Sequence, residues 1–258
     1  MRELAADLTA ETSDLTSMVS ELDEPGWRTP TPAAGWTIAD QVSHLAFFDD
    51  AAVRSATDPE GFTAEFAHAA QTGQLSPDDI AARYRSRTGA ELLGWFTASR
   101  RRLAETFAGL DAAARLPWFG PAMSAASSLT ARIMETWAHG QDVADALGIT
   151  RTPTARLRHV AHIAVRALPY SFAVRGLPVP GEPVRVVLAG PSGEPWAWGP
   201  PEAANVVTGP ALDFCLLATQ RRHRDDTAVA ASGEVANSWL SIAQAFAGPP
   251  GPGRPARR

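Results

Sequence analysis

Apolar residues recur at helical spacing through the first part of the chain. Leucine and valine positions between residues 2 and 24 predict a first helix, which Pro25-Gly26 ends. Thr37 has the side chain of an N-cap, which predicts a second helix that reaches about Ser55. His44 lies near the apolar face of this second helix, which is formed by Ile38, Val42, Leu45 and Phe48.

A long connection and a third helix are predicted next. Residues 56–77 contain prolines and glycines without sustained periodicity, so we expect a connection rather than a regular element. Ser76 and Pro77 have the types of an N-cap and a first helical residue, which predicts one long helix over residues 77–108. Its buried side is supplied by Ile80, Tyr84, Leu92, Trp95, Phe96, Leu103 and Phe107.

A fourth helix completes this set. Residues 117–121 are predicted to form a turn, after which a helix begins near Ser127 and Ser128. It ends at Gly148, because glycine is a suitable residue after a helix C-terminus. Consecutive helices joined in this way favour a bundle, so we predict a helical first domain over residues 1–149.

The pattern changes after the polar linker at residues 150–154. Alternating apolar and polar positions now predict strands between shorter helices. The predicted elements are a helix at 155–168, a strand at 183–188, its hairpin partner in EPWAWGP, a helix at 209–220, a strand at 227–231 and a helix at 235–246. The fold class is therefore α+β, with a four-helix bundle followed by a smaller α+β domain over residues 155–247. The proline- and glycine-rich residues 248–258 are expected to be disordered.

Composition and charge exclude several function classes. The formal net charge of −5 offers no broad basic surface, so we expect no nucleic-acid partner. No apolar run approaches the roughly 18 residues of a membrane-spanning helix, so we expect no membrane association. Cys215 is the sole cysteine, which rules out an internal disulfide and favours a reducing compartment. The acidic start lacks the features of a secretory signal, and the expected location is cytoplasmic.

Potential metal ligands stand at helical spacing in the fourth predicted helix. Glu135 and His139 are four residues apart in RIMETWAH, so their side chains lie one turn apart on one face. His44 lies on another predicted helix, and a shared metal ion would satisfy all three polar groups. This donor set suits zinc, with nickel, iron and manganese as alternatives. A Glu–His hydrogen bond or surface ion pair, with His44 as a core histidine, is the alternative interpretation.

Two longer segments carry a family resemblance. DQVSHLAFFDD in the second predicted helix and ARIMETWAHGQDVADALG in the fourth resemble the DinB-like, mycothiol-dependent maleylpyruvate isomerase family. The resemblance covers most of the chain and implies a DinB-like four-helix bundle that holds a divalent metal ion. The ligands it implies are a histidine of the second helix and the Glu-xxx-His pair of the fourth, here His44, Glu135 and His139.

The resemblance also implies a reaction. Several members of the superfamily are thiol S-transferases, in which the metal holds a low-molecular-weight thiol as thiolate. The chain is therefore expected to be a metal- and mycothiol-dependent transferase or isomerase, in which mycothiol attacks an electrophilic small molecule. A metal-hydroxide hydrolase or lyase, and a non-catalytic small-molecule-binding protein, are the alternatives. The expected oligomeric state is a monomer or a homodimer.

Three arginines are candidates for the catalytic site. Arg132 precedes Glu135 by about one helical turn and is expected to hold a substrate carboxylate or to steady Glu135, with a structural or solvated arginine as the alternative. In the isomerase an arginine of the second domain lies near the active site, and the resemblance of VVTGPALDFCLLATQRRHRDD makes Arg221 and Arg222 the candidates here. Arg222 is also the candidate for binding the thiol cofactor. An exposed helix end that interacts with the helix dipole would explain these arginines equally well.

Overall fold

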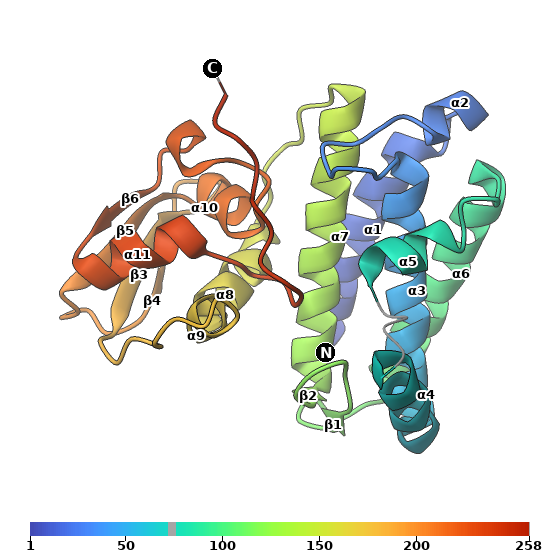
Figure 1. The fold of residues 1–258 in the computed structure, drawn as a ribbon, viewed down its shortest axis with the longest axis horizontal. Coiled ribbons are helices and arrows are strands. Elements are labelled where there is room, and N and C mark those ends of the chain that lie inside the picture. Colours follow the sequence, from blue (N-terminus) through green and yellow to red (C-terminus); the bar gives the residue numbers. More distant parts are fainter. Residues whose placement is uncertain (72–75, 258) are drawn as a thin grey trace. The chain divides into compact units, whose positions relative to one another are not determined.

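The chain folds into two compact units. The computed structural model describes residues 1–71 and 76–257, and the units are Met1–Arg151 and Thr152–Arg258 (Figure 1). Their boundary falls within the polar linker predicted between the two domains. The predicted fold class is confirmed, because a helical bundle is followed by a smaller α+β unit. The domain limits 1–149 and 155–247 stay a prediction.

Long helices form the body of the first unit. They are α1 (Arg2–Val19), α3 (Ile38–Thr57), α6 (Gly89–Ala108) and α7 (Ala125–Leu147), which pack along one another (Figure 1). The shorter elements are α2 (Glu24–Trp27), α4 (Pro59–Gln71), α5 (Pro77–Ala82) and the antiparallel pair β1 (Arg115–Leu116) and β2 (Met123–Ser124). Within residues 1–71 and 76–257, no helix has both the length and the apolar character needed to cross a membrane.

Apolar side chains on the facing sides of the long helices form the core of the bundle. One cluster contains Leu15, Val19, Val42, Leu45, Leu92, Phe96 and Val143. A second contains Leu8, Ala52, Leu103, Phe107, Leu129 and Ile133. Burial of apolar surface contributes about 25 cal/mol per Å², so these clusters hold α3 between α6 and α7.

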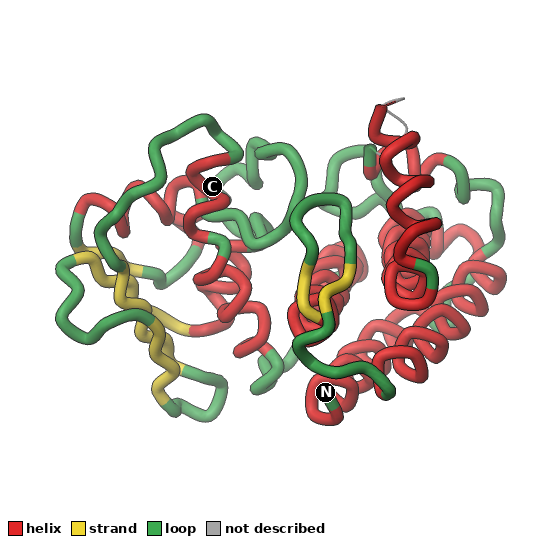
Figure 2. Tube along the Cα trace, turned by 90° about the horizontal axis from the view of Figure 1, so that it is seen from below, coloured by secondary structure: helices red, strands yellow, loops and turns green. Residues whose placement is uncertain are grey.

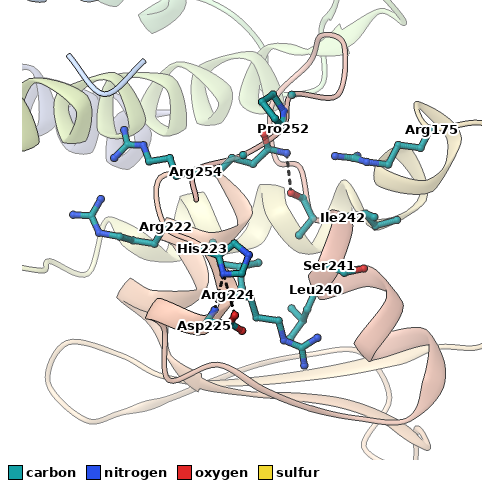
Figure 3. Close-up of a pocket in the computed structure, with 15 residues that line it drawn as sticks. Arg175, Arg222, His223, Arg224, Asp225, Leu240, Ser241, Ile242, Pro252 and Arg254 are labelled. Carbon is teal, nitrogen blue, oxygen red and sulfur yellow. Dashed lines mark hydrogen bonds and ion pairs between the residues drawn. The ribbon is translucent and has the colours of Figure 1, made fainter. Parts of the chain in front are cut away.

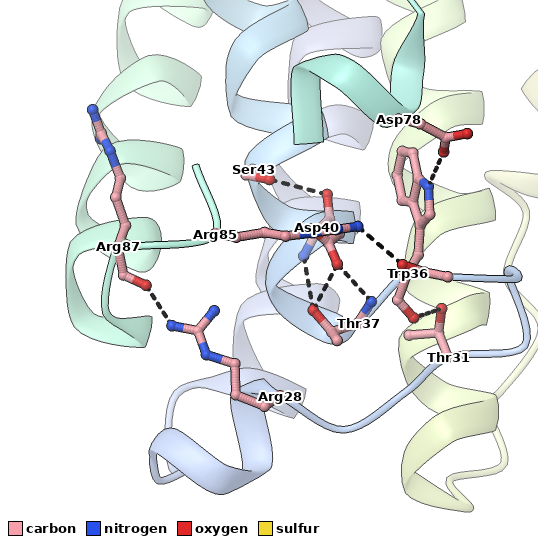
Figure 4. A network of polar contacts seen from close by, with 10 residues as sticks. Arg28, Thr31, Trp36, Thr37, Asp40, Ser43, Asp78, Arg85 and Arg87 are labelled. Carbon is pink, nitrogen blue, oxygen red and sulfur yellow. Dashed lines mark hydrogen bonds and ion pairs between the residues drawn. The ribbon is translucent and has the colours of Figure 1, made fainter. Parts of the chain in front are cut away.

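A polar network holds the start of α3 (Figure 4). Thr37 and Asp40 form a capping box, in which the Thr37 amide donates to Asp40 Oδ2 at 2.8 Å and the Asp40 amide donates to Thr37 Oγ1. Arg85 donates to Asp40 Oδ1 and to the carbonyl oxygen of Gly35, each at 3.0 Å. The predicted N-cap at Thr37 is confirmed, and the network joins the loop before α3 to the segment after α5.

The connection predicted at residues 56–77 is wrong over Pro59–Gln71, which form α4. Phe62 of this helix is buried and stacks with Trp118, with ring centroids 6.0 Å apart. The ring centroids of Phe66 and Phe119 lie 4.3 Å apart. These contacts give a short helix a buried face that local periodicity alone does not reveal.

Two other helix predictions differ from the structure. The helix predicted over residues 77–108 is interrupted, because Thr88 caps a new helix, α6, in a capping box with Glu91. The first helix ends at Val19, and α2 follows with Asp23 as its N-cap. In both places a side chain that satisfies free amide groups starts a new helix where apolar spacing had suggested a continuous one.

The second unit is built around a mixed sheet. Its strands, yellow in Figure 2, are β3 (Val184–Ala189), β4 (Pro195–Trp198), β5 (Asn205–Pro210) and β6 (Ala230–Ser232). Their order in the sheet is β4-β3-β5-β6 (Figure 1). The predicted hairpin is confirmed, because β3 and β4 are antiparallel with Val186 opposite Trp198. The parallel partner β5 was absent from the prediction, since NVVTGP is short and ends in turn-forming residues.

Helices pack beside this sheet. They are α8 (Leu157–Arg166), α9 (Leu168–Ala173), α10 (Ala211–Ala218) and α11 (Glu234–Ile242), with the 3-10 turn η1 (Arg224–Asp226) after α10. Cys215 of α10 is fully buried, and burial raises the pKa of its thiol. A buried neutral thiol of this kind is a packing residue rather than a nucleophile.

The end of the chain is irregular within the described residues. Residues 248–257 form neither helix nor strand. The Tyr170 hydroxyl donates to the Gly248 carbonyl oxygen at 2.8 Å, and the Arg257 amide donates to the Asp226 carboxylate at 3.0 Å. The disorder expected for residues 248–258 stays a prediction.

A buried ion pair links three of the long helices. Asp49 of α3 lies 3.1 Å from a guanidinium nitrogen of Arg100 of α6, and both side chains are buried. The same nitrogen donates to Thr136 Oγ1 of α7 at 3.1 Å. Burial raises the pKa of Asp49 to about 6 even though Arg100 and Arg132 lower it, and burial also lowers the pKa of Arg100. Each charge therefore depends on the other to remain in the core.

We expect Arg100→Met to destabilise the protein by about 3–5 kcal/mol at pH 7.5, because Asp49 would stay buried without this partner. The pKa of Asp49 would rise further above its ordinary value of 3.8, so the folded variant would bind a proton that the unfolded chain releases. By linkage, the deficit in the free energy of unfolding grows with pH and is smaller at pH 5 than at pH 7.5. Urea unfolding of the parent and the variant at the two pH values measures this deficit.

Arg102→Met is the matched control for this prediction. Arg102 lies on the same helix and pairs with Asp50 at 2.6 Å, but 46% of its side chain is exposed. Loss of an exposed pair costs about 1 kcal/mol or less. Equal losses for the two variants, or a deficit in Arg100→Met that does not change with pH, would contradict the prediction.

Candidate metal centre

Two helices of the bundle bring three potential metal ligands together. His44 comes from α3, and Glu135 and His139 come from α7. One ligand atom of each side chain lies within 4.8 Å of the other two. Both histidines are buried with 8% of their surface exposed, and Glu135 is partly buried. A single ion can bridge donors at this separation.

The Glu135 carboxylate lies against His139. Its Oε2 atom is 3.3 Å from His139 Nε2, as the four-residue spacing on α7 allows. Burial tends to raise the pKa of Glu135, but the hydrogen bond with His139 and the charges of His139, Arg132 and His44 outweigh burial and lower it to about 2. The carboxylate is therefore ionised at neutral pH, which is the form that binds a metal ion.

The other ring nitrogen of His139 points to Gln41. Nδ1 of His139 lies within hydrogen-bond distance of Gln41 Oε1. Gln41 is fully buried on α3 and precedes His44 by three residues, so the two side chains share a helix face. A ligand candidate on α7 is thus anchored by a side chain of α3, with Nε2 of His139 directed to Glu135.

Aromatic rings cover the two histidines. Trp36 stacks on His139, with ring centroids 5.9 Å apart and an angle of 16° between the planes. The ring centroids of Phe48 and His44 lie 4.6 Å apart. The indole Nε1 of Trp36 donates to Asp78 Oδ1 at 2.6 Å, which fixes the ring in place (Figure 4). An apolar cover of this kind lowers the local dielectric constant and strengthens electrostatic interactions beneath it.

Arg132 is buried one turn before Glu135. Its guanidinium carbon lies 5.8 Å from the centre of the Phe48 ring and 5.7 Å from that of Trp118. Its positive charge lowers the pKa of both Glu135 and Asp49. The buried Nη1 atom has no hydrogen-bond partner among the residues that the structure describes. Arg132 therefore lies beside the cluster, and its catalytic role stays a prediction.

Arg221 and Arg222 lie in the second unit, shortly after α10. The guanidinium of Arg221 donates to the Thr219 carbonyl oxygen at 2.7 Å, and that of Arg222 donates to the Arg221 carbonyl oxygen at 2.6 Å. Arg222, unlike Arg221, lines a cavity of about 250 Å³ (Figure 3). The other charged or titratable residues that line it are Arg175, His223, Arg224, Asp225 and Arg254. The catalytic and cofactor-binding roles of the two arginines stay predictions.

Gln41 and Trp36 do not stand out in the sequence as members of this site. For Gln41 a signal exists, because a polar residue three positions before His44 faces the same way on a helix. For Trp36 there is none, since it lies in the loop before α3, where no periodicity indicates the direction of the ring. Only the folded chain shows that both contact His139.

The fold and the site together define a class of protein. It is a helical bundle in which two histidines and a glutamate converge from two helices. Residues 8–144 match the family model described as the mycothiol maleylpyruvate isomerase N-terminal domain, and the chain belongs to this family. The resemblance carried by the two sequence segments is thereby confirmed. Residues 180–232 also match a model described as wyosine base formation.

Curated relatives and solved structures align with nearly the whole chain. Two uncharacterized proteins from two strains of Mycobacterium tuberculosis are each 51% identical over 249 residues, which are 96% of this chain and 97% of theirs. The crystal structure of the mycothiol-dependent maleylpyruvate isomerase is similar with a TM-score of 0.60 and 20% identity, covering 90% of this chain and 92% of that chain. A histidine-to-alanine mutant of that enzyme gives a TM-score of 0.60 at 19% identity. At these identities the structural likeness shows the fold.

In the metal-free protein we expect the Glu135 carboxyl group to titrate with a pKa of about 2. Because this lies below the ordinary value of 4.5, the group contributes stability that is present above pH 4.5 and lost as the pH falls toward 2. The side-chain carboxyl ¹³C shift, recorded in EDTA and assigned with Glu135→Gln, measures the pKa. His139→Gln should raise it, whereas a parent pKa at or above 4.5 would contradict the prediction.

Proposed function

We propose that this protein binds one divalent metal ion through His44, Glu135 and His139 and uses it to activate mycothiol for reaction with an electrophilic small molecule. The observation that carries the proposal is the convergence of three ligand atoms within 4.8 Å of one another. Family membership supports mycothiol as the thiol, since a solved structure with this fold is that of a mycothiol-dependent maleylpyruvate isomerase. The reaction is an isomerisation or an S-transfer.

The donor set fits a zinc ion. Two imidazoles and one carboxylate leave a position for a further ligand, as catalytic zinc sites do. Glu135 is ionised because its pKa is about 2. The contact between His139 Nδ1 and Gln41 directs the opposite ring nitrogen to the cluster. Zn²⁺ is our choice, and nickel, iron and manganese accept the same nitrogen and oxygen donors.

The proposed chemistry needs no thiol from the protein. A divalent cation bound at the cluster would lower the pKa of a thiol beside it, so that a thiolate nucleophile exists at neutral pH. Cys215 cannot serve instead, because it is fully buried in the second unit and burial raises its pKa. Trp36 and Phe48 lie against the histidines, and the lower dielectric constant beneath them would strengthen the attraction between a bound cation and a thiolate.

The arginines are proposed to bind anionic groups. Arg132 would hold a substrate carboxylate or steady Glu135, and its guanidinium is close enough to Glu135 to lower the pKa of that carboxyl group. Arg221 and Arg222 are proposed to contribute from the second unit, with Arg222 also binding the thiol. The position of Arg222 on the wall of a cavity rich in arginine supports that role.

We expect the protein purified without chelators to contain about one equivalent of divalent metal per chain, and His44→Ala and His139→Ala to contain almost none. Each substitution removes one of three protein ligands, which leaves too few donors to retain the ion through purification. Inductively coupled plasma mass spectrometry measures the metal content. His162→Ala is the control, because His162 lies on α8 of the second unit and should leave the content unchanged.

Failure to load the parent protein with zinc, nickel, iron or manganese would overturn the metal proposal. Equal metal content in the parent and both histidine variants would place the ion elsewhere. Circular dichroism melting of each variant separates loss of ligand from loss of fold.

We expect turnover of an electrophile to require both mycothiol and the metal. Maleylpyruvate and other unsaturated or halogenated electrophiles would be incubated with and without mycothiol, before and after removal of metal with a chelator and its return. Loss of turnover on either omission supports the proposal. Turnover that needs metal but no thiol would instead indicate a metal-hydroxide hydrolase or lyase, and ligand binding without turnover would indicate a binding protein.

We expect Arg132→Met to lower kcat/KM by about tenfold or more, because a charge-assisted contact is lost. An increase in KM with normal metal content would assign Arg132 to the substrate carboxylate. A lower metal content would assign it to Glu135. Arg101→Met, an exposed arginine on α6, is the control, and a normal kcat/KM in Arg132→Met would contradict the proposal.

A further inference from the structure

We infer that Gln41 is a positioning residue that keeps Nδ1 of His139 protonated and thereby directs Nε2, the atom beside Glu135, to the metal ion. This inference rests on the proposed function, because it assigns Gln41 a role toward the ion that His139 is proposed to bind. The observations that carry it are the contact of Gln41 with His139 and the hydrogen bonds that fix the orientation of the Gln41 amide.

A chain of hydrogen bonds runs from the loop before α3 to the histidine. The backbone amide of Thr31 and its hydroxyl both donate to the carbonyl oxygen of Trp36, at 2.8 Å and 3.0 Å (Figure 4). The Gln41 side-chain amide nitrogen donates to Thr31 Oγ1 at 2.9 Å. The Gln41 oxygen, at the other end of the same amide, meets His139 Nδ1. The chain therefore ends on the imidazole.

The hydrogen bonds of the structure set the direction of this chain. Thr31 has a single hydroxyl hydrogen, and with that hydrogen on the Trp36 carbonyl oxygen, Thr31 Oγ1 accepts from Gln41. The nitrogen of the Gln41 amide then faces Thr31, and its oxygen faces His139. Because an amide oxygen carries no hydrogen, Nδ1 of His139 must be the donor. Nε2, the atom that lies 3.3 Å from Glu135 Oε2, shares its proton with that carboxylate in the metal-free protein, and a metal ion would take the place of this proton.

The same loop also fixes the plane of the imidazole. Trp36, whose carbonyl oxygen begins the chain, stacks its ring on His139 with 16° between the planes. The edge of His139 is therefore held through Gln41 and its face through Trp36. A ligand restrained in this way loses little freedom when it binds an ion, and partners of this kind change metal affinity by about 10- to 100-fold.

Burial raises the free-energy cost of losing the hydrogen bond between Gln41 and His139. Gln41 has none of its surface exposed and lies among the apolar residues of α3, such as Ile38, Val42 and Leu45. A buried amide that lost its acceptor or donor would cost about 1–3 kcal/mol, so Gln41 and His139 hold each other in place. Gln41→Leu would keep the volume and remove the acceptor, whereas Gln41→Glu would keep an acceptor at the same place.

The first measurement uses metal-free protein labelled with ¹⁵N in histidine. We expect a slowly exchanging Nδ1–H signal from His139, identified by its absence in His139→Ala. The signal should be lost in Gln41→Leu and retained in Gln41→Glu, because only the second variant offers an acceptor. A parent protein with no protected Nδ1–H at His139 would overturn the inference without any reference to metal.

The second measurement is the affinity for Zn²⁺, determined by competition with a chromophoric chelator. We expect Gln41→Leu to weaken binding by about 10- to 100-fold and Gln41→Glu to restore it to within a few-fold of the parent. Gln141→Leu is the matched control, because Gln141 is a buried glutamine of α7 that bonds Asp145 rather than a histidine. Its affinity should equal that of the parent.

Thr31→Val and Thr31→Ser test the chain if Gln41→Leu does not fold. Thr31→Val removes the acceptor that orients the amide and should weaken Zn²⁺ binding by several-fold, while Thr31→Ser should not. Parent affinity in both Gln41→Leu and Thr31→Val would overturn the inference and leave the metal site standing. A parent that shows the protected Nδ1–H but binds none of the four metals would overturn the proposed function and leave Gln41 a structural anchor.

Discussion

The first unit depends on the register between α3 and α7. His44 and Gln41 are carried by one helix and Glu135 and His139 by the other, so a displacement of one residue along either helix would separate the donors. Apolar clusters hold the two helices together, and the Asp49–Arg100 pair with its bond to α7 adds a directional constraint that apolar contacts lack. Apolar packing holds the two helices together, and the buried Asp49–Arg100 pair with its bond to α7 fixes the register between them.

Electrostatic balance explains how so many polar groups remain in the core. Arg132 lowers the pKa of both Glu135 and Asp49, and Arg100 also lowers that of Asp49, so each of these two carboxylates has a cation near it. The two carboxylates nevertheless differ. Burial dominates at Asp49 and raises its pKa to about 6, whereas the histidines and Arg132 dominate at Glu135 and lower its pKa to about 2. Environment thus raises the pKa of one buried carboxyl group and lowers that of the other.

The fold of this family tolerates wide changes in sequence. A TM-score of 0.60 at 20% identity means that the helical packing and the following sheet are kept while most side chains differ. Apolar positions can exchange for one another when volume and pattern are preserved, whereas a reaction depends on a few side chains at set distances. The shared fold therefore does not specify a reaction, which depends on a few side chains and their geometry.

The sequence by itself determined the features that arise within one helical turn or one hairpin. The N-cap at Thr37, the single face shared by Glu135 and His139, and the pairing of β3 with β4 belong to this group, because local spacing specifies them. The tertiary structure alone decided that residues Pro59–Gln71 are helical and that Gln41 contacts His139. The physical reason is sequence separation: Gln41 and His139 are 98 residues apart, and packing of α3 against α7 brings them into contact.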